Sequence, residues 1–477
     1  MTSLPVRAAM SVWCAAEPGL ADAVGDWCDD LAGNDPAQHA AAVARPGLLP
    51  PLRSIRYVAA LQVANAQWAA GQLSSPGLRP IRHPDAWAKE GIAEILRRQL
   101  SLMGPAGAEV ARIIASSEGL LPQVVVDELQ RHPVRMRRFS GATAEMLARA
   151  EFGDRVSQLS DRPVTATPMA QLHAAVLDGD RPVSVWVRRP GIRRTARADA
   201  RITASIVAAI EALVPAAGDL HPLGFVELAA RQALQEADLR QAALNAIELA
   251  LALEDIGAEG IHVARPLPGL VTRRALVQED LPGARPFDHA AEMLPPDEAV
   301  ASWLAAGLEA GLAAGVFHAD LRPEHLVVLP DRRLAVVGTG AVGRFDLRMR
   351  HSAFAFLIAL LSGDHAGAVA AMRDAGAVPP GADEAALVAE LATTPSLSPM
   401  TMLSTEGGLT GALSDAVGVL LRHRLRPPVE VVLFVRNVFG FRSFLATVAP
   451  ETTMMAALMP LVQRLPDLHA RLAAEPA

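Results

Sequence analysis

The spacing of apolar residues changes from helical to alternating near residue 164, and this change constrains the fold more than any other feature. Before it, Gly104–Arg131 carries apolar stripes at helical spacing and predicts two helices joined by a turn. After it, Val183, Val185 and Val187 alternate with their neighbours, which predicts a strand of a small antiparallel sheet. The chain should therefore combine such a sheet with many helices.

Helical periodicity returns over residues 194–255, where Phe225–Leu253 contains no Gly or Pro to interrupt it. Leu276–Gly283 predicts a strand that ends in a turn, and Leu326–Leu329 and Leu334–Val337 predict two more strands around a tight turn. The remainder of the chain is expected to be helical.

Composition supports a helical interior. The 477 residues are 51% hydrophobic but only 4% aromatic, so Ala, Leu and Val must fill the core, which favours close-packed helices over a β-sandwich. This length suggests two or three packed units. A formal charge of −7 argues against nucleic-acid binding, which requires a basic surface.

The cysteine count, the N-terminus and the apolar runs all bear on where in the cell the protein is expected. Cys14 and Cys28 are too few for a disulfide framework and form no metal-binding motif, so we expect a reducing cytoplasm. The N-terminus makes a poor secretory signal. Apolar runs such as Ser352–Ser362 and Val431–Val435 fall well short of the ~18 residues that a membrane span needs, so we predict no transmembrane helix and leave peripheral membrane contact open.

One segment carries a specific resemblance. His318–Asp346, with the residue before it, reads FHADLRPEH, then LVVLPDRRLAV, then VGTGAVGRFD. It resembles the joined catalytic and metal-binding loops of UbiB-type (AarF-like) atypical kinase-like proteins, which read roughly FHADPHPGN, a hairpin, then IDFGMVGRLD. The register holds for about thirty residues without a gap, which is far more specific than a short motif.

Further matches follow in the family's order and cover residues from about 100 to 450. Gly104–Leu129 is similar to GPTFxKxGQ…LLPxxxxxEL, and Thr165–His173 to the Ala-rich nucleotide loop AAASxGQVH. Val183–Gly191 is similar to the strand VAVKVQRPG, Glu236–Ala246 to ELDxxREAANA, and Pro427–Pro450 to a closing helix that begins PPELVLL.

The resemblance implies an α+β, protein-kinase-like fold of two lobes, with a small antiparallel sheet in the N-lobe and a helical C-lobe. It predicts an N-terminal helical extension over residues 1–99, a family-specific helical pair over the cleft at 100–160, the N-lobe at 161–285 and the C-lobe at 286–477.

Residues that hold ATP and magnesium in this family are largely replaced. Phosphoryl transfer depends on positioning and charge neutralisation by a Lys, a Glu and the metal ligands Asp and Asn. Trp186 stands at the lysine position and either plugs the nucleotide site or is a core Trp under the sheet. Gly338 and His325 occupy the Asp and Asn positions, and neither offers the oxygen that magnesium prefers.

Other nucleotide-site positions are mixed. Glu109 and Arg112 replace the Lys and Gln of KxGQ, which inverts the local charge. Gln171 and Glu236 match the family residues, whereas a later Glu of the same motif has become Ala242.

The catalytic triplet keeps His318 and Asp320. In kinase-like folds these two residues also tie the catalytic loop together by hydrogen bonds. Without a metal opposite, a charge on Asp320 has little phosphate to act on, so we interpret both residues as vestigial and structural.

The favoured hypothesis is a non-catalytic, pseudokinase-like protein that binds a partner enzyme or a lipid-like small molecule, because family members support isoprenoid-quinone and related lipid pathways. It expects no cofactor, and at most weak ATP binding without metal. An alternative is a divergent but active ATPase or phosphotransferase that draws on Arg188, Asp331 or Asp346. A third hypothesis is a helical scaffold whose old nucleotide cleft is filled.

Overall fold

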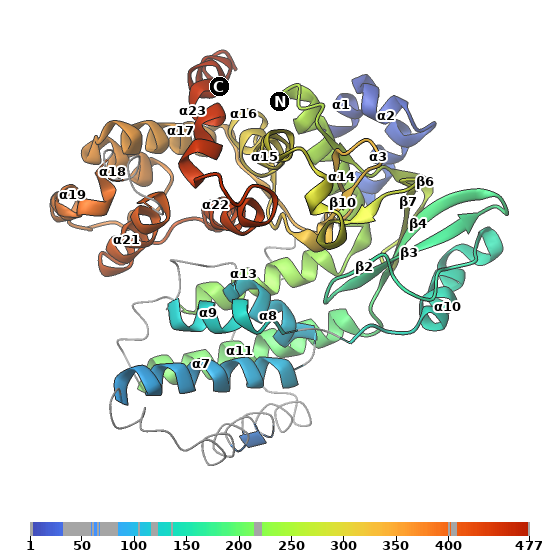
Figure 1. The fold of residues 1–477 in the computed structure, drawn as a ribbon, viewed down its shortest axis with the longest axis horizontal. Coiled ribbons are helices and arrows are strands. Elements are labelled where there is room, and N and C mark those ends of the chain that lie inside the picture. Colours follow the sequence, from blue (N-terminus) through green and yellow to red (C-terminus); the bar gives the residue numbers. More distant parts are fainter. Residues whose placement is uncertain are drawn as a thin grey trace.

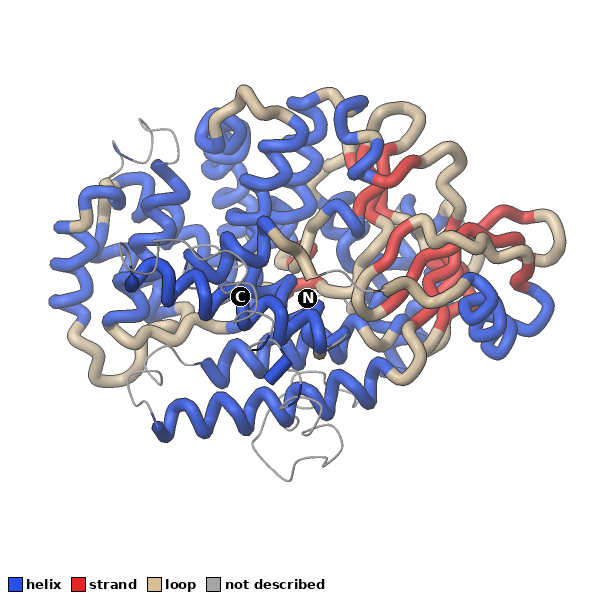
Figure 2. The backbone as a smooth tube through the Cα atoms, turned by 60° about the horizontal axis from the view of Figure 1, so that its bottom comes forward, coloured by secondary structure: helices blue, strands red, loops and turns tan. Residues whose placement is uncertain are grey.

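The computed structural model describes most of the chain. The described residues are 3–31, 84–103, 105–115, 123–134, 137–213, 222–398 and 408–475, with isolated positions at 59, 62, 63, 66 and 401. Most strands lie at one side of the molecule, and helices dominate the other side (Figure 2).

The larger sheet has six strands in the order β1-β3-β4-β7-β6, with β2 paired to β3, and every pairing is antiparallel. Asp178 and Gly179 connect β3 to β4 with positive φ values of 48° and 94°, which tight hairpin turns require. The strands are β1 (Val156–Ser157), β2 (Thr165–Ala166), β3 (Ala170–Leu177), β4 (Arg181–Arg188), β6 (Pro266–Val271) and β7 (Ala275–Glu279).

Alternation along β4 places its side chains on two different cores. Val183, Val185 and Val187 pack with helix α10 (Gly141–Phe152) on one face. Trp186 points to the other face, where the core is shared with helices α3 (Leu20–Leu31) and α14 (Leu239–Asp255). The predicted alternation at 183–187 is therefore confirmed, and both faces of the strand are covered.

Two smaller sheets position the loop that carries His318 and Asp320. One has the order β5-β11-β10-β8, in which β5 runs parallel to β11, and the other pairs β9 with β12. The two predicted strands at 326–337 are confirmed, each one residue shorter than expected. The strands are β5 (Ile261–Val263), β8 (Arg285–Pro286), β9 (Val316–His318), β10 (Leu326–Val328), β11 (Leu334–Val336) and β12 (Val342–Arg344).

The long helix predicted across 225–253 is divided in two. It breaks after Glu236, and the Asp238 side chain accepts a hydrogen bond from the Arg240 amide and so caps the second helix. Asp238 is neither Gly nor Pro, but a side chain that caps the start of a new helix competes with continuing the preceding one. The central helices are α11 (Ile192–Leu213), α13 (Pro222–Glu236) and α14 (Leu239–Asp255).

Helices near the N-terminus form two groups. The first packs on α14 through α3, and the second lies along α11 and α13 on the opposite side of the molecule (Figure 1). The first group is α1 (Leu4–Met10), α2 (Val12–Ala15) and α3 (Leu20–Leu31), and the second is α7 (Pro84–Leu102), α8 (Pro105–Ala115) and α9 (Gln123–Arg131).

The C-terminal region is helical, as expected. Its core centres on Trp303, which packs against Phe441 and Phe444 with ring centroids 4.8 and 6.0 Å away. Its α-helices are α15 (Pro296–Leu304), α16 (Ala310–Ala314), α17 (Leu347–Ser362), α18 (His365–Asp374), α19 (Glu384–Thr393), α21 (Gly408–Arg422), α22 (Val429–Val448) and α23 (Met454–Ala473). A π-helical turn spans Ala305–Glu309, and short 3₁₀ helices are η1 (Gly153–Arg155), η2 (Phe287–His289), η3 (Ala291–Met293), η5 (Pro323–His325) and η6 (Pro395–Leu397).

Helix α22 is, within the described part of the chain, long and apolar enough to cross a membrane by length and composition. Counting uninterrupted apolar runs did not identify it. The core helix of a soluble protein passes the same test, and 44% of its most apolar window is buried in the fold. The expected absence of a membrane span therefore stays a prediction. The α+β class, with a small antiparallel sheet lobe, a helical portion and N-terminal helices, is confirmed.

Candidate functional site

The loop between β9 and β10 is held by its two histidines. The backbone N–H of Asp320 donates to Nδ1 of His318 at 3.1 Å, so Nε2 carries the proton and donates to the Gly338 carbonyl at 2.7 Å. His325 Nδ1 lies 2.8 Å from the Asp320 carbonyl oxygen. Burial lowers the pKa of His318 to about 4, which keeps its ring neutral.

Arginines from three segments surround the Asp320 carboxylate. Its oxygens lie 2.6 Å from Arg112 on α8, 2.9 Å from Arg322 in the loop and 3.3 Å from Arg436 on α22. Burial alone would raise the pKa of Asp320, but these guanidinium groups and His325 outweigh it and hold the pKa well below its usual range. Asp320 is thus the ionised centre of a buried ion-pair cluster.

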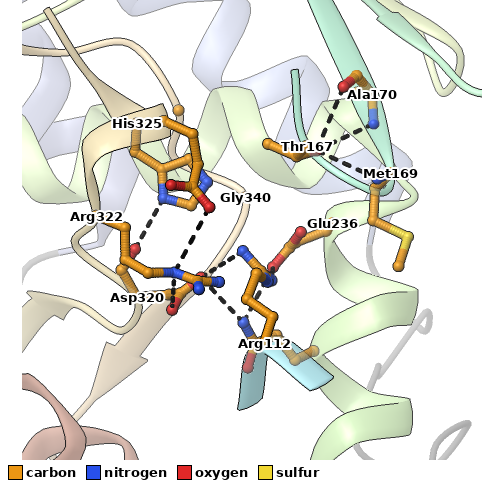
Figure 3. Close-up of polar contacts among 12 residues, drawn as sticks. Arg112, Thr167, Met169, Ala170, Glu236, Asp320, Arg322, His325 and Gly340 are labelled. Carbon is orange, nitrogen blue, oxygen red and sulfur yellow. Dashed lines mark hydrogen bonds and ion pairs between the residues drawn. The ribbon is translucent and has the colours of Figure 1, made fainter. Parts of the chain in front are cut away.

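Glu236 completes this cluster from α13. It accepts from Arg112 at 2.7 Å (Figure 3). It also accepts from Gln232 at 3.1 Å. Gln232 in turn donates to Asp320 at 3.4 Å and accepts from Arg436 at 3.1 Å. Side chains from α8, α13 and α22 therefore meet at one carboxylate of the β9–β10 loop.

Trp186 fills the space between the sheet and this loop. Its side chain is 5% exposed, and the indole N–H donates to the Val337 carbonyl at 2.8 Å. It shares a core with Leu172, Ala242 and Val337. The lysine position of the family is thus occupied by a buried ring that is bonded to the residue before Gly338.

The imidazole ring of His325 packs against the backbone of Gly338. A Cβ at position 338 would lie 2.6 Å from His325 Cδ2, so the imidazole takes the space of any side chain there. The structure thus brings together Trp186, Gly338 and His325 on one side and Arg112, Glu236 and Asp320 on the other, joined through His318.

Gln171 lies elsewhere. Its side chain is fully buried on β3, and in the orientation that suits its neighbours the amide bonds Phe139 and His173. Glu109 is placed on α8, but its side chain lies outside the described residues.

The residues of the alternative active-enzyme hypothesis are engaged in other contacts. Arg188 donates to the Ala237 carbonyl at 2.8 Å, and Asp331 pairs with its turn neighbour Arg333 at 2.8 Å. Asp346 caps α17.

Thr167 was not singled out from the sequence, although it lies in the segment similar to the nucleotide loop. Its hydroxyl accepts from the backbone N–H groups of Met169 and Ala170 at 3.2 and 3.1 Å (Figure 3). These amides are therefore satisfied within the loop by a local Ser/Thr-type turn. A Thr three residues before the start of a strand is a signal that could have indicated this turn.

Arg436 and Asn437 were also missed. Asn437 donates to the His318 carbonyl at 2.5 Å and to the Gly307 carbonyl at 3.0 Å, and Arg436 contacts Asp320. Both are 3% exposed within the apolar helix α22. An Arg-Asn pair inside an apolar helix indicates buried polar partners, because such groups are rarely buried unpaired.

Among the described residues, no group of three or more His, Cys, Asp or Glu side chains is arranged to hold a metal ion. Glu236 and Asp320 have carboxylate oxygens, but arginines already engage them. The site as built is a buried network of ion pairs and hydrogen bonds.

Comparison with known proteins identifies the relatives of this chain. An ABC1 atypical kinase-like domain matches residues 135–372. An uncharacterized protein of Mycobacterium tuberculosis is 28% identical over 420 residues, covering 84% of this chain and 83% of that protein. A probable protein kinase UbiB of Aliivibrio fischeri is 26% identical over 258 residues, covering 51% of this chain and 46% of its own length.

A Mycobacterium tuberculosis protein solved in complex with erythromycin is similar in structure, with a TM-score of 0.38 and 17% identity, covering 72% of this chain and 91% of that one. The matching domain includes the sheet, the His318–Asp320 loop and Gly338. Residues 135–372 of this chain thus belong to the ABC1/UbiB family of atypical kinase-like domains.

Proposed function

We propose that this chain is a non-catalytic member of its family, a pseudokinase that acts by binding rather than by phosphoryl transfer. The observation that carries the proposal is the triple arginine contact of Asp320. A catalytic Asp must accept a proton from, or orient, the attacking hydroxyl. The oxygens of Asp320 are instead engaged by the guanidinium groups of Arg112, Arg322 and Arg436, so the carboxylate serves a structural ion-pair cluster.

The metal and phosphate positions support the same proposal. Magnesium takes oxygen ligands in near-octahedral geometry, whereas Gly338 has no side chain and the His325 ring is packed against it. Trp186 supplies no cation for phosphates, and its indole N–H is already bonded to Val337. Thr167 satisfies loop amides that could otherwise face a phosphate.

We further propose that the protein serves as an accessory or binding protein for a lipid, isoprenoid or other small-molecule biosynthetic pathway. This rests on the family's association with isoprenoid-quinone and related lipid pathways. The match spans about half the length of the UbiB kinases, so we do not propose the activity of those whole proteins for this chain. The partner would be an enzyme or a lipid-like molecule in the cytoplasm, with peripheral membrane contact as one mode of access.

The test is calorimetry of the full chain with ATP, with ADP and with magnesium, separately and together. We expect no increase in nucleotide affinity when magnesium is added, because the usual metal ligands are replaced at His325 and Gly338. Weak binding of ATP without metal is compatible with the proposal. Magnesium-enhanced ATP binding together with phosphate release would contradict it and favour the active-enzyme alternative.

A further inference from the structure

We propose that a cavity among the C-terminal helices is a binding site for the hydrocarbon part of a small lipid-like molecule. The cavity lies among α17, α18, α22 and α23 and has a volume of about 230 Å³. These helices form the orange-to-red end of the molecule, apart from the sheet (Figure 1). None of the residues of the Asp320 cluster lines it.

The lining of the cavity selects for apolar ligands. Ser352 is the one residue with a polar side chain among the described residues that line it. Representative lining residues are Phe356 and Leu360 of α17, Val431 and Phe434 of α22, and Leu458 of α23. A buried water needs two to four polar partners, so this lining cannot retain ordered water.

The volume indicates the size of the ligand. Voids larger than a water molecule are few in natural cores, and an apolar cavity of roughly 150 Å³ stays dry and accepts benzene. At the same cavity volume per carbon atom as benzene has there, the present cavity holds on the order of nine carbon atoms. This corresponds to a medium-length alkyl chain or about two isoprene units.

The cavity also reaches the surface. Phe356, Leu357, Leu360 and Leu361 line it along α17, and each is partly exposed rather than buried. A chain could enter between these side chains and leave its polar head in water. This geometry fits an amphiphile better than a fully apolar molecule.

This inference deepens the proposed function, since it locates the lipid-like ligand, but it has its own test. Nucleotide binding reports on the site around Asp320, whereas hydrocarbon binding reports on the cavity among the C-terminal helices. A failure of one measurement therefore leaves the other proposal standing.

The experiment measures binding of n-alkanols from butanol to dodecanol, below their aggregation limits, by calorimetry on the full chain. Affinity should rise about fourfold per added methylene while the chain fills the cavity, and then level off near nonanol or decanol. Geraniol, with the same carbon count as decanol, distinguishes a prenyl from a straight-chain preference.

Matched variants on one helix give the specificity control. Ala353 lines the cavity, whereas Ala355, two residues further along α17, is exposed. Ala353→Phe should fill the cavity and lower the affinity for decanol at least tenfold, with little loss of thermal stability. Ala355→Phe should bind decanol with the affinity of the unmodified chain. If Ala353→Phe does not fold, Val435→Phe fills the same cavity from α22.

Three outcomes would overturn the proposal: no alkanol binding, an affinity that keeps rising with chain length through dodecanol, or equal binding by the Ala353→Phe and Ala355→Phe variants. The second outcome would indicate partition onto an open surface rather than into a cavity of fixed volume.

Discussion

The imidazole of His325 lies where a side chain at Gly338 would have to be, since a Cβ at 338 would approach His325 Cδ2 to 2.6 Å. These positions match the Asn and Asp that hold magnesium in the family that the sequence resembles. The ring of His325 therefore takes up the space that a carboxylate side chain at position 338 would need. Restoring a carboxylate at 338 while His325 is kept creates a steric conflict.

We expect Gly338→Asp to lower the free energy of unfolding by about 1–3 kcal/mol, because overpacking forces neighbouring groups to move. Adding His325→Asn should recover part of the loss, so the two effects should be non-additive. Urea denaturation of both single variants and the double variant measures the coupling. Gly25→Ala is the control, since a Cβ at this helical glycine meets nothing within 4 Å and should be neutral or stabilising. Additive effects would contradict the packing relationship.

Trp186→Ala should cost about 3–5 kcal/mol of stability, because it removes a buried ring and leaves a cavity between the sheet and Val337. Trp186→Phe should lose less stability, because it keeps most of the buried apolar area. It removes only the hydrogen bond from the indole N–H to the Val337 carbonyl. Thermal and urea denaturation rank the two. A loss for Trp186→Ala as small as that for Trp186→Phe would show that the indole does not fill the space.

Trp186→Lys alone should destabilise the fold without creating ATPase activity, because the new cation lacks its family partners. The comparison is with the combined variant Trp186→Lys, Gly338→Asp, Ala242→Glu and His325→Asn, measured by phosphate release and melting temperature. Phosphate release by the single variant would mean that the nucleotide site was never dismantled, and the active-enzyme hypothesis would replace the pseudokinase proposal.

Asp320→Asn should destabilise the protein by about 3–5 kcal/mol, since it leaves buried guanidinium groups without their shared carboxylate. The folded-state pKa of Asp320 lies below its ordinary value of 3.8, so its contribution is present above that pH and is lost as pH falls below it. The gap between wild type and Asp320→Asn in urea midpoints should therefore narrow below about pH 4. Asp331→Asn, at an exposed ion pair with Arg333, is the control and should change little.

His318 should give stability a second dependence on pH. Burial lowers its pKa to about 4 from an ordinary 6.5, so the unfolded chain binds more protons between these values and stability falls as pH decreases through that window. The full effect is roughly 3 kcal/mol, because each tenfold difference in proton affinity between the folded and unfolded chain is worth about 1.4 kcal/mol. Urea midpoints from pH 4 to 7 should show a shallower slope for His318→Gln, whereas exposed His289→Gln should keep the wild-type slope. Equal slopes in all three proteins would contradict the buried neutral state.

The sequence by itself determined the fold class and which chemical groups are missing. Alternation of Val183, Val185 and Val187 predicted a strand because successive side chains point to opposite faces, and period alone decides this. The absence of a cation at 186 and of an oxygen at 338 is fixed by residue type, whatever the conformation. The continuous register of His318–Asp346 located both the loop and its hairpin.

Only the tertiary structure decided how these positions are used. Arg112 and Arg436 lie 208 and 116 residues from Asp320 in the sequence, and their meeting at this carboxylate depends on helix packing that no local pattern encodes. The fit of His325 against Gly338 is likewise a matter of distance. Composition and periodicity act over a few residues, whereas ion pairs and steric exclusion depend on which distant segments the fold brings within a few ångströms.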